Sequence, residues 1–168
     1  MAGSVLDGKK ILAVDDEPDV LASLSEEIME ACPNCTFDQA TTYEDAVKKL
    51  DTSHYDVVIL DIMGVRGFDV LENAIKKRLK VAMLTAQALS SATLKRSHEM
   101  GARAYIPKEK LGEIVPFLED VLTYEFETGW KKLFEKLHHF FTDKFESDWE
   151  KKTGLQWREW GTFSDTKK

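Results

Sequence analysis

The feature that most limits the folds open to this chain is a set of short apolar runs, each of which ends in a polar side chain. The runs and the residues that follow them are 11–14 with Asp15 and Asp16, 57–60 with Asp61, 81–84 with Thr85, and 105–107 with Lys108. Short β-branched runs separated by helical patterns are typical of buried strands in a parallel sheet. Because parallel strands point the same way, their carboxyl ends form one edge, where ligands bind. We therefore expect three carboxylates, a hydroxyl and an ammonium to lie close together.

The spacing of apolar residues between the runs predicts helices that alternate with the strands. Strands are expected at about 10–15, 36–40, 55–61, 80–85 and 103–106, and helices begin near Pro18, at Thr42, after Gly67, near residue 90 and from Leu111 onward. Five such repeats predict an α/β fold, a doubly wound five-stranded parallel sheet with helices on both faces and right-handed crossovers.

Composition narrows the functional classes. A chain of 168 residues has the length of one domain with an appendage. Its net charge of −7 argues against nonspecific nucleic-acid binding, which needs a basic surface. The first seven residues have neither a basic nor an apolar region of a secretion signal, and no apolar run approaches the roughly 20 residues that span a bilayer. We therefore expect a cytoplasmic protein without nucleic-acid or membrane partners.

The residues at the predicted edge favour phosphoryl chemistry. Clustered carboxylates repel one another unless a cation neutralises them, so Asp15, Asp16 and Asp61 are candidate ligands of a hard ion. Carboxylates and waters in octahedral geometry favour Mg²⁺ or Mn²⁺ over zinc. A carboxylate beside such an ion can attack a phosphoryl group, whose oxygens would also meet Lys108 and Thr85. The alternative is structural: Asp15 and Asp16 cap the next helix, and Asp61 is a loop residue.

These motifs identify a resemblance. The Asp15-Asp16 pair, the run Leu60-Asp61-Ile62-Met63, Thr85-Ala86, and a lysine three residues after Tyr105 match the receiver domain of two-component response regulators over about residues 8–123. The resemblance implies the flavodoxin-like strand order 2-1-3-4-5, for which the chemotaxis member of the family is a standard example.

The resemblance also implies the role of each acidic residue. Asp61 resembles the phosphoacceptor, which takes a phosphoryl group from the phosphohistidine of a sensor histidine kinase. Asp16 and Asp61 resemble direct Mg²⁺ ligands, together with the backbone carbonyl of Met63. Asp15 resembles the residue that holds the ion through water. Such a domain is a phosphoacceptor, and it is not an enzyme that acts on a diffusible substrate.

A second set of residues resembles the family's switch. Lys108 would pair with the phosphoryl group, and Thr85 would move to hydrogen-bond it. Tyr105 resembles the aromatic residue that turns inward when the threonine moves, which would shift the population of a two-state surface. The alternative for Tyr105 is an ordinary aromatic at a sheet edge.

Two positions depart from the family pattern. The family usually has lysine followed by proline with a cis bond, whereas this chain has Pro107 before Lys108, so a cis bond there is not expected. Gly64 stands where proline is usual, so we expect the loop that carries Met63 to be more flexible. Both departures leave the reacting groups in place. They keep open the alternative of a receiver-like scaffold that does not switch and acts through its C-terminal helix.

The last 45 residues change character, which divides the chain into a receiver domain (1–123) and a helical, aromatic-rich extension (124–168) with a disordered end. The extension carries nine Lys/Arg and nine Asp/Glu, and its large apolar residues recur every three or four positions, which predicts a helix with one aromatic face. This stripe comprises Phe126, Trp130, Leu133, Phe134, Leu137, Phe140, Phe141, Phe145 and Trp149.

An exposed stripe of this size needs a cover. We favour pairing with a second copy through Phe126, Trp130, Leu133, Leu137 and Phe141, which would make a homodimer. Folding back on the receiver and docking to a different protein are the alternatives. Since the extension is too short for a winged helix, we expect output through protein contacts rather than DNA binding.

Two further motifs are weaker. Cys32-Pro33-Asn34-Cys35 could be a redox pair or half of a zinc site, but no second pair of ligands accompanies it, so two free thiols are expected. His138-His139 could suggest a histidine phosphotransfer module, but such a module needs a bundle of several helices. We expect these histidines to border the aromatic stripe.

Overall fold

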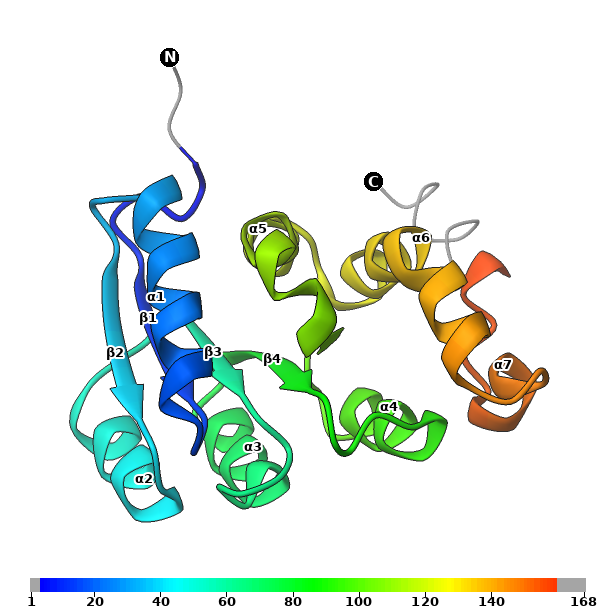
Figure 1. Ribbon diagram of the computed structural model, residues 1–168, viewed down its shortest axis with the longest axis horizontal. Coiled ribbons are helices and arrows are strands. Elements are labelled where there is room, and N and C mark those ends of the chain that lie inside the picture. Colours follow the sequence, from blue (N-terminus) through cyan, green and yellow to red (C-terminus); the bar gives the residue numbers. More distant parts are fainter. Residues whose placement is uncertain (1–3, 160–168) are drawn as a thin grey trace.

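The computed structural model describes residues 4–159 of the chain (Figure 1). The receiver part comprises β1 (Lys10–Val14), α1 (Pro18–Ala31), β2 (Thr36–Ala40), α2 (Tyr43–Thr52), β3 (Val57–Leu60), α3 (Gly67–Lys76), β4 (Lys80–Thr85), α4 (Ser91–Glu99), β5 (Ala104–Pro107), the short 3-10 helix η1 (Lys108–Glu113) and α5 (Ile114–Thr123). The extension comprises α6 (Phe126–Lys144), α7 (Trp149–Thr153) and η2 (Trp157–Glu159).

The five strands form one parallel sheet in the order β2-β1-β3-β4-β5, which confirms the predicted flavodoxin-like arrangement. The three central strands are almost continuous apolar runs because helices cover both faces, with α1 and α5 on one side and α2, α3 and α4 on the other (Figure 1). The predicted boundaries of the receiver elements agree with the observed ones to within two residues, except that α5 begins at Ile114, three residues after the predicted start at Leu111, because η1 precedes it.

The strand register explains why the polar residues converge. Val14 of β1 lies opposite Leu60 of β3, so Asp15 and Asp61, one residue further on, leave the sheet side by side. On the other side of β3, Thr85 lies opposite Pro107, which directly precedes Lys108. All these side chains emerge at the carboxyl edge of the sheet, as the sequence predicts.

Local sequence signals account for the helices that flank this edge. Pro18 occupies the first turn of α1, where a missing N–H has no cost. The Oγ1 of Thr42 caps α2 by accepting the N–H of Asp45, and Ser90 caps α4 in the same way through Thr93. Polar caps at these positions therefore set where two of the helices begin.

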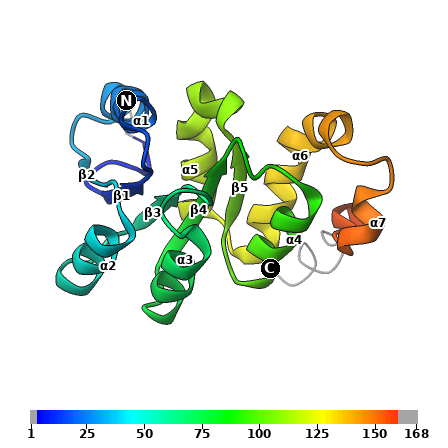
Figure 2. The same cartoon turned by 60° about the horizontal axis from the view of Figure 1, so that its bottom comes forward.

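The extension folds back on the receiver, beside α4, β5 and α5 (Figure 2). The stripe is buried in this contact: Trp130, Phe134 and Phe141 are 0% exposed, and Leu133 and Leu137 are at most 3% exposed. The predicted use of these residues as a surface for a second copy was therefore wrong, and the alternative of folding back is the one the structure adopts. Phe126, the first residue of the stripe, is partly buried and packs against the same core.

The single predicted helix over the stripe is also interrupted. α6 ends at Lys144, and Trp149 begins α7, which turns back so that its indole packs on Phe134 and Phe141. Trp157 of η2, beyond the stripe, is also buried and packs on Phe134. The end of the extension, which the sequence predicts to be disordered, lies outside the described residues.

Among residues 4–159, no helix is both long and apolar enough to cross a membrane.

Candidate functional site

Three carboxylates meet at the carboxyl edge of the sheet. Asp15, Asp16 and Asp61 each place a carboxylate oxygen within 4.8 Å of the other two. Asp15 and Asp61 are 2% and 5% exposed, whereas Asp16 is exposed. Buried carboxylates are costly unless they are paired or coordinate a cation. The donor set, all oxygen, therefore fits a hard divalent ion such as Mg²⁺.

Lys108 reaches into this cluster although it follows the proline. Its Nζ lies 2.9 Å from Asp15 Oδ2, 3.6 Å from Asp61 Oδ2 and 3.4 Å from Glu17 Oε1. As expected for this order of residues, no cis peptide bond occurs between residues 4 and 159. The order Pro107-Lys108, in place of the family's lysine followed by proline, therefore leaves the ammonium of Lys108 in the site.

Burial and mutual repulsion change the acidity of the buried groups. Burial, followed by the charge of Asp15, raises the pKa of Asp61 from 3.8 to about 6, although Lys108 opposes the change. Burial also raises the pKa of Asp15, against the hydrogen bond from the Glu17 N–H and the pairing with Lys108. Burial disfavours the charged form of Lys108, but the hydrogen bond to Asp15 and the charge of Asp61 more than compensate, so its pKa is raised. The cluster thus carries more negative charge than one ammonium can neutralise.

Thr85 and Tyr105 are both buried behind this edge. Thr85 is 0% exposed, and its Oγ1 has no hydrogen-bond partner in the part of the chain that the structure describes. A buried hydroxyl without a partner is uncommon and is free to donate to a group that arrives at the site. Tyr105, also 0% exposed, is turned inward: its Oη accepts the N–H of Ser90 at 3.0 Å and lies 2.7 Å from Thr93 Oγ1.

Two glycines shape the site, and sequence reasoning treated them only as loop residues. Gly64 has φ +87°, which proline cannot adopt, and a side chain there would collide with the carboxylate of Asp16. A Cβ on Gly67 would collide with the backbone carbonyl of Asp61 and lie 2.7 Å from Ile62 Cα. A glycine at the start of α3 is therefore required because the backbone of Asp61 and Ile62 approaches it closely.

The site opens to the surface through a cavity of about 250 Å³. Its lining adds exposed Met63 and Gln87 to the groups already described, together with Glu17, whose contact with Lys108 the sequence did not suggest. The position of Glu17 directly after Asp16 is the only signal that could have found it. The cavity is large enough for a phosphoryl group and its waters.

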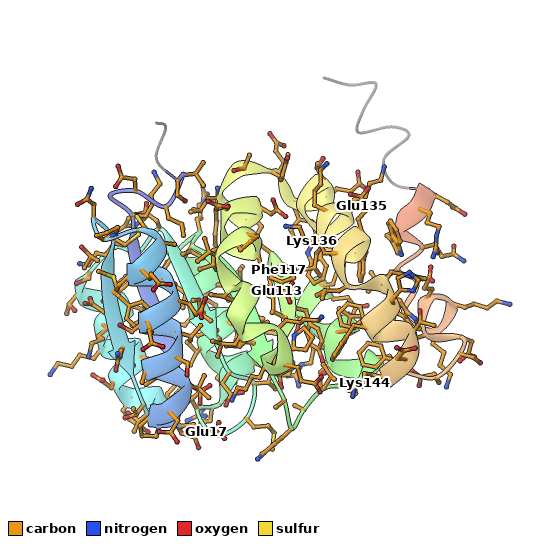
Figure 3. All side chains as sticks on the ribbon, turned by 45° about the horizontal axis from the view of Figure 1, so that its top comes forward. Glu17, Glu113, Phe117, Glu135, Lys136 and Lys144 are labelled. Carbon is orange, nitrogen blue, oxygen red and sulfur yellow. The ribbon has the colours of Figure 1, made fainter. Side chains whose placement is uncertain are left out.

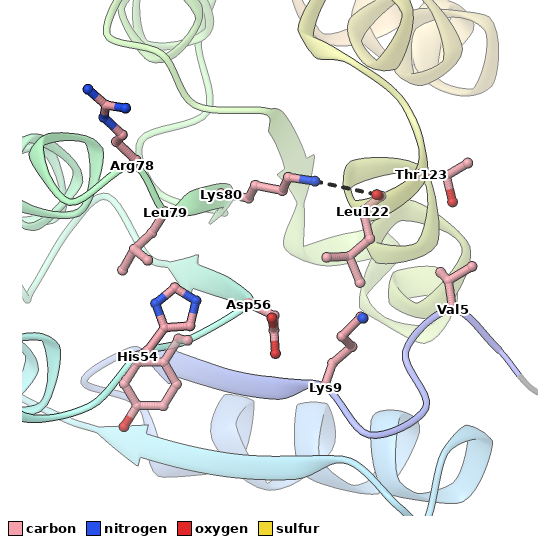
Figure 4. Close-up of a pocket in the computed structure, with 10 residues that line it drawn as sticks. Val5, Lys9, His54, Asp56, Arg78, Leu79, Lys80, Leu122 and Thr123 are labelled. Atoms are coloured by element: carbon pink, nitrogen blue, oxygen red, sulfur yellow. Dashed lines mark hydrogen bonds between the residues drawn. The ribbon is translucent and has the colours of Figure 1, made fainter.

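A larger cavity, of about 600 Å³, lies at the opposite, amino-terminal end of the strands (Figure 4). There Lys80 Nζ donates to the carbonyl of Leu122 at 3.4 Å, near the end of α5. Burial, with the charges of Arg103 and Lys9, lowers the pKa of Lys80. Among the described residues that line this cavity, Asp56 is the one carboxylate, and Lys80 is the cation that contacts the end of α5.

The two weaker motifs have structural roles. Cys32 and Cys35 are free and buried, and the thiol of Cys35 donates to the carbonyl of Leu6 at 2.9 Å. Burial and the neighbouring Cys32 raise the pKa of Cys35 to about 12, which makes it a poor nucleophile. His138 Nε2 lies 2.9 Å from Glu150 Oε2 on α7, far along the chain from the acidic site.

The fold and the site together define the class of a phosphoacceptor domain built on a doubly wound sheet. Comparison with known proteins agrees: the model of the response regulator receiver domain matches residues 11–118. The chain belongs to this family of two-component response regulators, whose receiver domains accept a phosphoryl group on aspartate and bind Mg²⁺ at an acidic pocket.

Solved structures of receiver domains resemble most of this chain. The non-phosphorylated HemR receiver domain from Leptospira biflexa is 31% identical with a TM-score of 0.60, and the match covers 70% of this chain and 96% of that one. The response regulator TrrA from Thermotoga maritima, in complex with Mg²⁺ and BeF, is 34% identical with a TM-score of 0.58. That match covers 68% of this chain and 99% of the TrrA chain.

A curated relative is the transcriptional regulatory protein TcrA of Mycobacterium tuberculosis. It is 37% identical over 84 residues, which are 48% of this chain and 32% of TcrA. The chain thus spans about a third of the length of the curated relative that it matches.

Proposed function

We propose that this protein is a cytoplasmic response regulator that accepts a phosphoryl group on Asp61 from the phosphohistidine of a sensor histidine kinase. Asp61 and Asp16, with the carbonyl of Met63, would hold Mg²⁺ directly, and Asp15 would hold it through water. Output would pass through protein contacts rather than DNA binding.

The transfer itself needs little from the protein beyond placement and charge. A carboxylate oxygen of Asp61 forms a bond to phosphorus as the P–N bond of the phosphohistidine breaks. The imidazole leaves with the electron pair of that bond and takes up a proton. When bound, the divalent ion neutralises charge that gathers on the phosphoryl oxygens. Lys108 pairs with one of these oxygens, and the Thr85 hydroxyl donates to another.

The observation that carries the proposal is the convergence of Asp61 with two further carboxylates and Lys108 in one cavity. A purely structural cluster would not need a buried acid whose charge its neighbours oppose. The Oγ1 of Thr85, which has no hydrogen-bond partner among the described residues, adds a hydroxyl that can donate to a phosphoryl oxygen. Together these groups supply every contact that an aspartyl phosphate requires.

Binding of beryllofluoride, an analogue of the phosphoryl group, tests the assignment. With Mg²⁺ present, wild-type protein should bind one equivalent of beryllofluoride with a discrete ¹⁹F signal, and Asp61→Asn should not. Asp69→Asn, which removes an exposed carboxylate of α3, is the matched control and should bind as wild type does. Equal binding by Asp61→Asn would remove Asp61 from its proposed role, and no binding by wild type would favour the non-switching scaffold.

A further inference from the structure

The extension contacts the receiver at Tyr105, the residue that the family resemblance makes the switch aromatic. The ring of Phe141 on α6 lies 6.0 Å from the ring of Tyr105 on β5, and both side chains are 0% exposed. Phe141 is itself held by Phe145, whose ring stacks on it at 5.1 Å and 6°, and by Trp149 of α7. The extension thus places an anchored aromatic ring against Tyr105.

Polar contacts fix the extension along the same face. Trp130 donates its indole N–H to the carbonyl of Ala102 at 2.9 Å, just before β5. Lys136 Nζ lies 2.7 Å from Asp120 of α5 and 5.2 Å from the centre of the Phe117 ring, and Figure 3 shows Lys136 and Phe117 between the two helices. These contacts give α6 one position relative to the receiver.

The enclosure of Tyr105 makes docking of α6 depend on the position of this side chain. On one side its hydroxyl contacts Ser90 and Thr93, at the start of α4. On the other side the ring contacts Phe141. Because the side chain is fully enclosed, its ring cannot turn outward unless Phe141 moves away. The docked extension is therefore compatible with the inward position of Tyr105.

The hydroxyl of Tyr105 is also connected to the acidic edge through the chain. Thr85 ends β4, and residues 86–90 lead from it to Ser90, whose N–H donates to the Tyr105 hydroxyl. Movement of Thr85 toward a phosphoryl group on Asp61 would displace this short segment. Tyr105 therefore lies between a group that phosphorylation recruits and a ring that belongs to the extension.

We infer that the extension is a built-in partner of the α4–β5–α5 face, that it binds the inward position of Tyr105, and that phosphorylation of Asp61 strengthens its docking. This inference rests on the proposed function, and on the role that the family resemblance implies for Tyr105, whose ring is inward in the phosphorylated state. Linkage then requires the reverse effect, so that the docked extension favours acceptance of the phosphoryl group. The extension acts as a positive effector of its own receiver and occupies the face that would otherwise bind another protein.

Hydrogen exchange of the full chain tests the coupling in one direction. Amides of residues 137–145 are followed with and without Mg²⁺ and beryllofluoride, and saturation is checked by the ¹⁹F signal. Exchange should slow by about fivefold or more on binding, a typical size for coupling between two sites. Unchanged or faster exchange at saturation overturns the inference and leaves the proposed function intact. Absence of the ¹⁹F signal in wild type would instead refute the proposed function.

Variants of the extension test the reverse direction. Phe141→Ala should weaken beryllofluoride binding by a similar factor, about fivefold or more, whereas Phe140→Ala, which removes the adjacent half-buried ring, should leave it unchanged. If Phe141→Ala does not fold, the double variant Lys136→Glu, Lys144→Glu replaces it. That variant sets acidic groups against Asp120 and Glu109 and loosens docking while it keeps every aromatic ring. Wild-type affinity in a variant whose α6 amides exchange faster would overturn the inference.

Discussion

The indole N–H of Trp130 donates to the backbone carbonyl of Ala102 at a distance of 2.9 Å, and the ring is fully buried. This bond joins the second turn of α6 to the residue that leads into β5, at the open edge of the sheet. An edge strand otherwise presents unpaired backbone groups to other chains. The extension therefore covers a part of the receiver that would be prone to association.

Loss of this contact should destabilise the whole chain rather than the extension alone. Trp130→Ala removes a large buried ring and leaves the Ala102 carbonyl without its donor, so the free energy of unfolding should fall by about 4 kcal/mol. Chemical denaturation followed by circular dichroism measures this value. Trp130→Phe, which keeps most of the apolar surface, should cost clearly less. A loss below about 1 kcal/mol for Trp130→Ala would mean that the extension is not docked in solution.

Two glycine variants should have opposite effects. Gly67→Ala would force a methyl group against the backbone of Asp61 and should destabilise the protein by about 2 kcal/mol and slow phosphoryl uptake. Gly129 lies inside α6, and the nearest atom to an added Cβ is 3.8 Å away, so Gly129→Ala should stabilise by up to about 1 kcal/mol. Thermal unfolding of both variants is the measurement. Stabilisation by Gly67→Ala would contradict the packing described around Asp61.

The acidic edge could be predicted from the sequence because its geometry follows from strand register. Asp15 and Asp61 each come one residue after paired strand ends, so a parallel sheet has to place them together. The arrival of Lys108 at this edge could be predicted too, but its pairing with Asp15 and Glu17 could not, since the position of its Nζ depends on how the chain leaves β5 after Pro107. The hydrogen bonds of the Tyr105 hydroxyl to Ser90 and Thr93 depend on long-range packing, which the sequence pattern does not contain.

The packing of the extension could be predicted less well than the acidic edge. The spacing of Trp130, Leu133 and Leu137 correctly indicates a buried helical face, but an apolar stripe fits any apolar surface. Pairing with a second copy and folding back bury the same residues, so periodicity alone cannot separate them. What decides is the complementary surface around Tyr105, whose shape exists only after the receiver has folded.

The repulsion among the carboxylates predicts a pH-dependent gain in stability when Asp61 loses its charge. The pKa of Asp61 is raised in the folded state, from 3.8 to about 6, by burial and by Asp15. Its stabilising contribution is therefore complete below pH 3.8 and is lost as the pH rises through 6. In the presence of a chelator, Asp61→Asn should be about 2 kcal/mol more stable than wild type at pH 8, and the difference should vanish near pH 4.

Denaturant unfolding at the two pH values measures this difference. Asp143→Asn, which neutralises an exposed carboxylate on α6, should not reproduce it. Added Mg²⁺ should stabilise wild type but not Asp61→Asn, and the stabilisation should weaken as the pH falls through 6 because protons compete for the ligand. An Asp61→Asn variant that is less stable than wild type at pH 8 would contradict the electrostatic account.

Replacement of Lys108 should separate ion binding from phosphoryl transfer. In Lys108→Met the acidic cluster loses its ammonium, so Mg²⁺ should bind more tightly. Phosphoryl uptake should slow by about 10²-fold because the phosphoryl oxygens lose a positioned donor. Titration with Mg²⁺ and the rate of uptake from a small acyl phosphate measure the two effects. Lys110→Met, two residues further along the chain, should alter neither; parallel losses of both in Lys108→Met would assign Lys108 a merely structural role.

The most direct test of the central claim is the intact mass of the protein after incubation with Mg²⁺ and a small acyl-phosphate donor. Wild type should gain one phosphoryl group, and Asp61→Asn should gain none. Phosphoryl uptake by Asp61→Asn at the wild-type rate, or no uptake by wild type in any combination of donor and metal, would contradict the assignment of Asp61 as the phosphoacceptor.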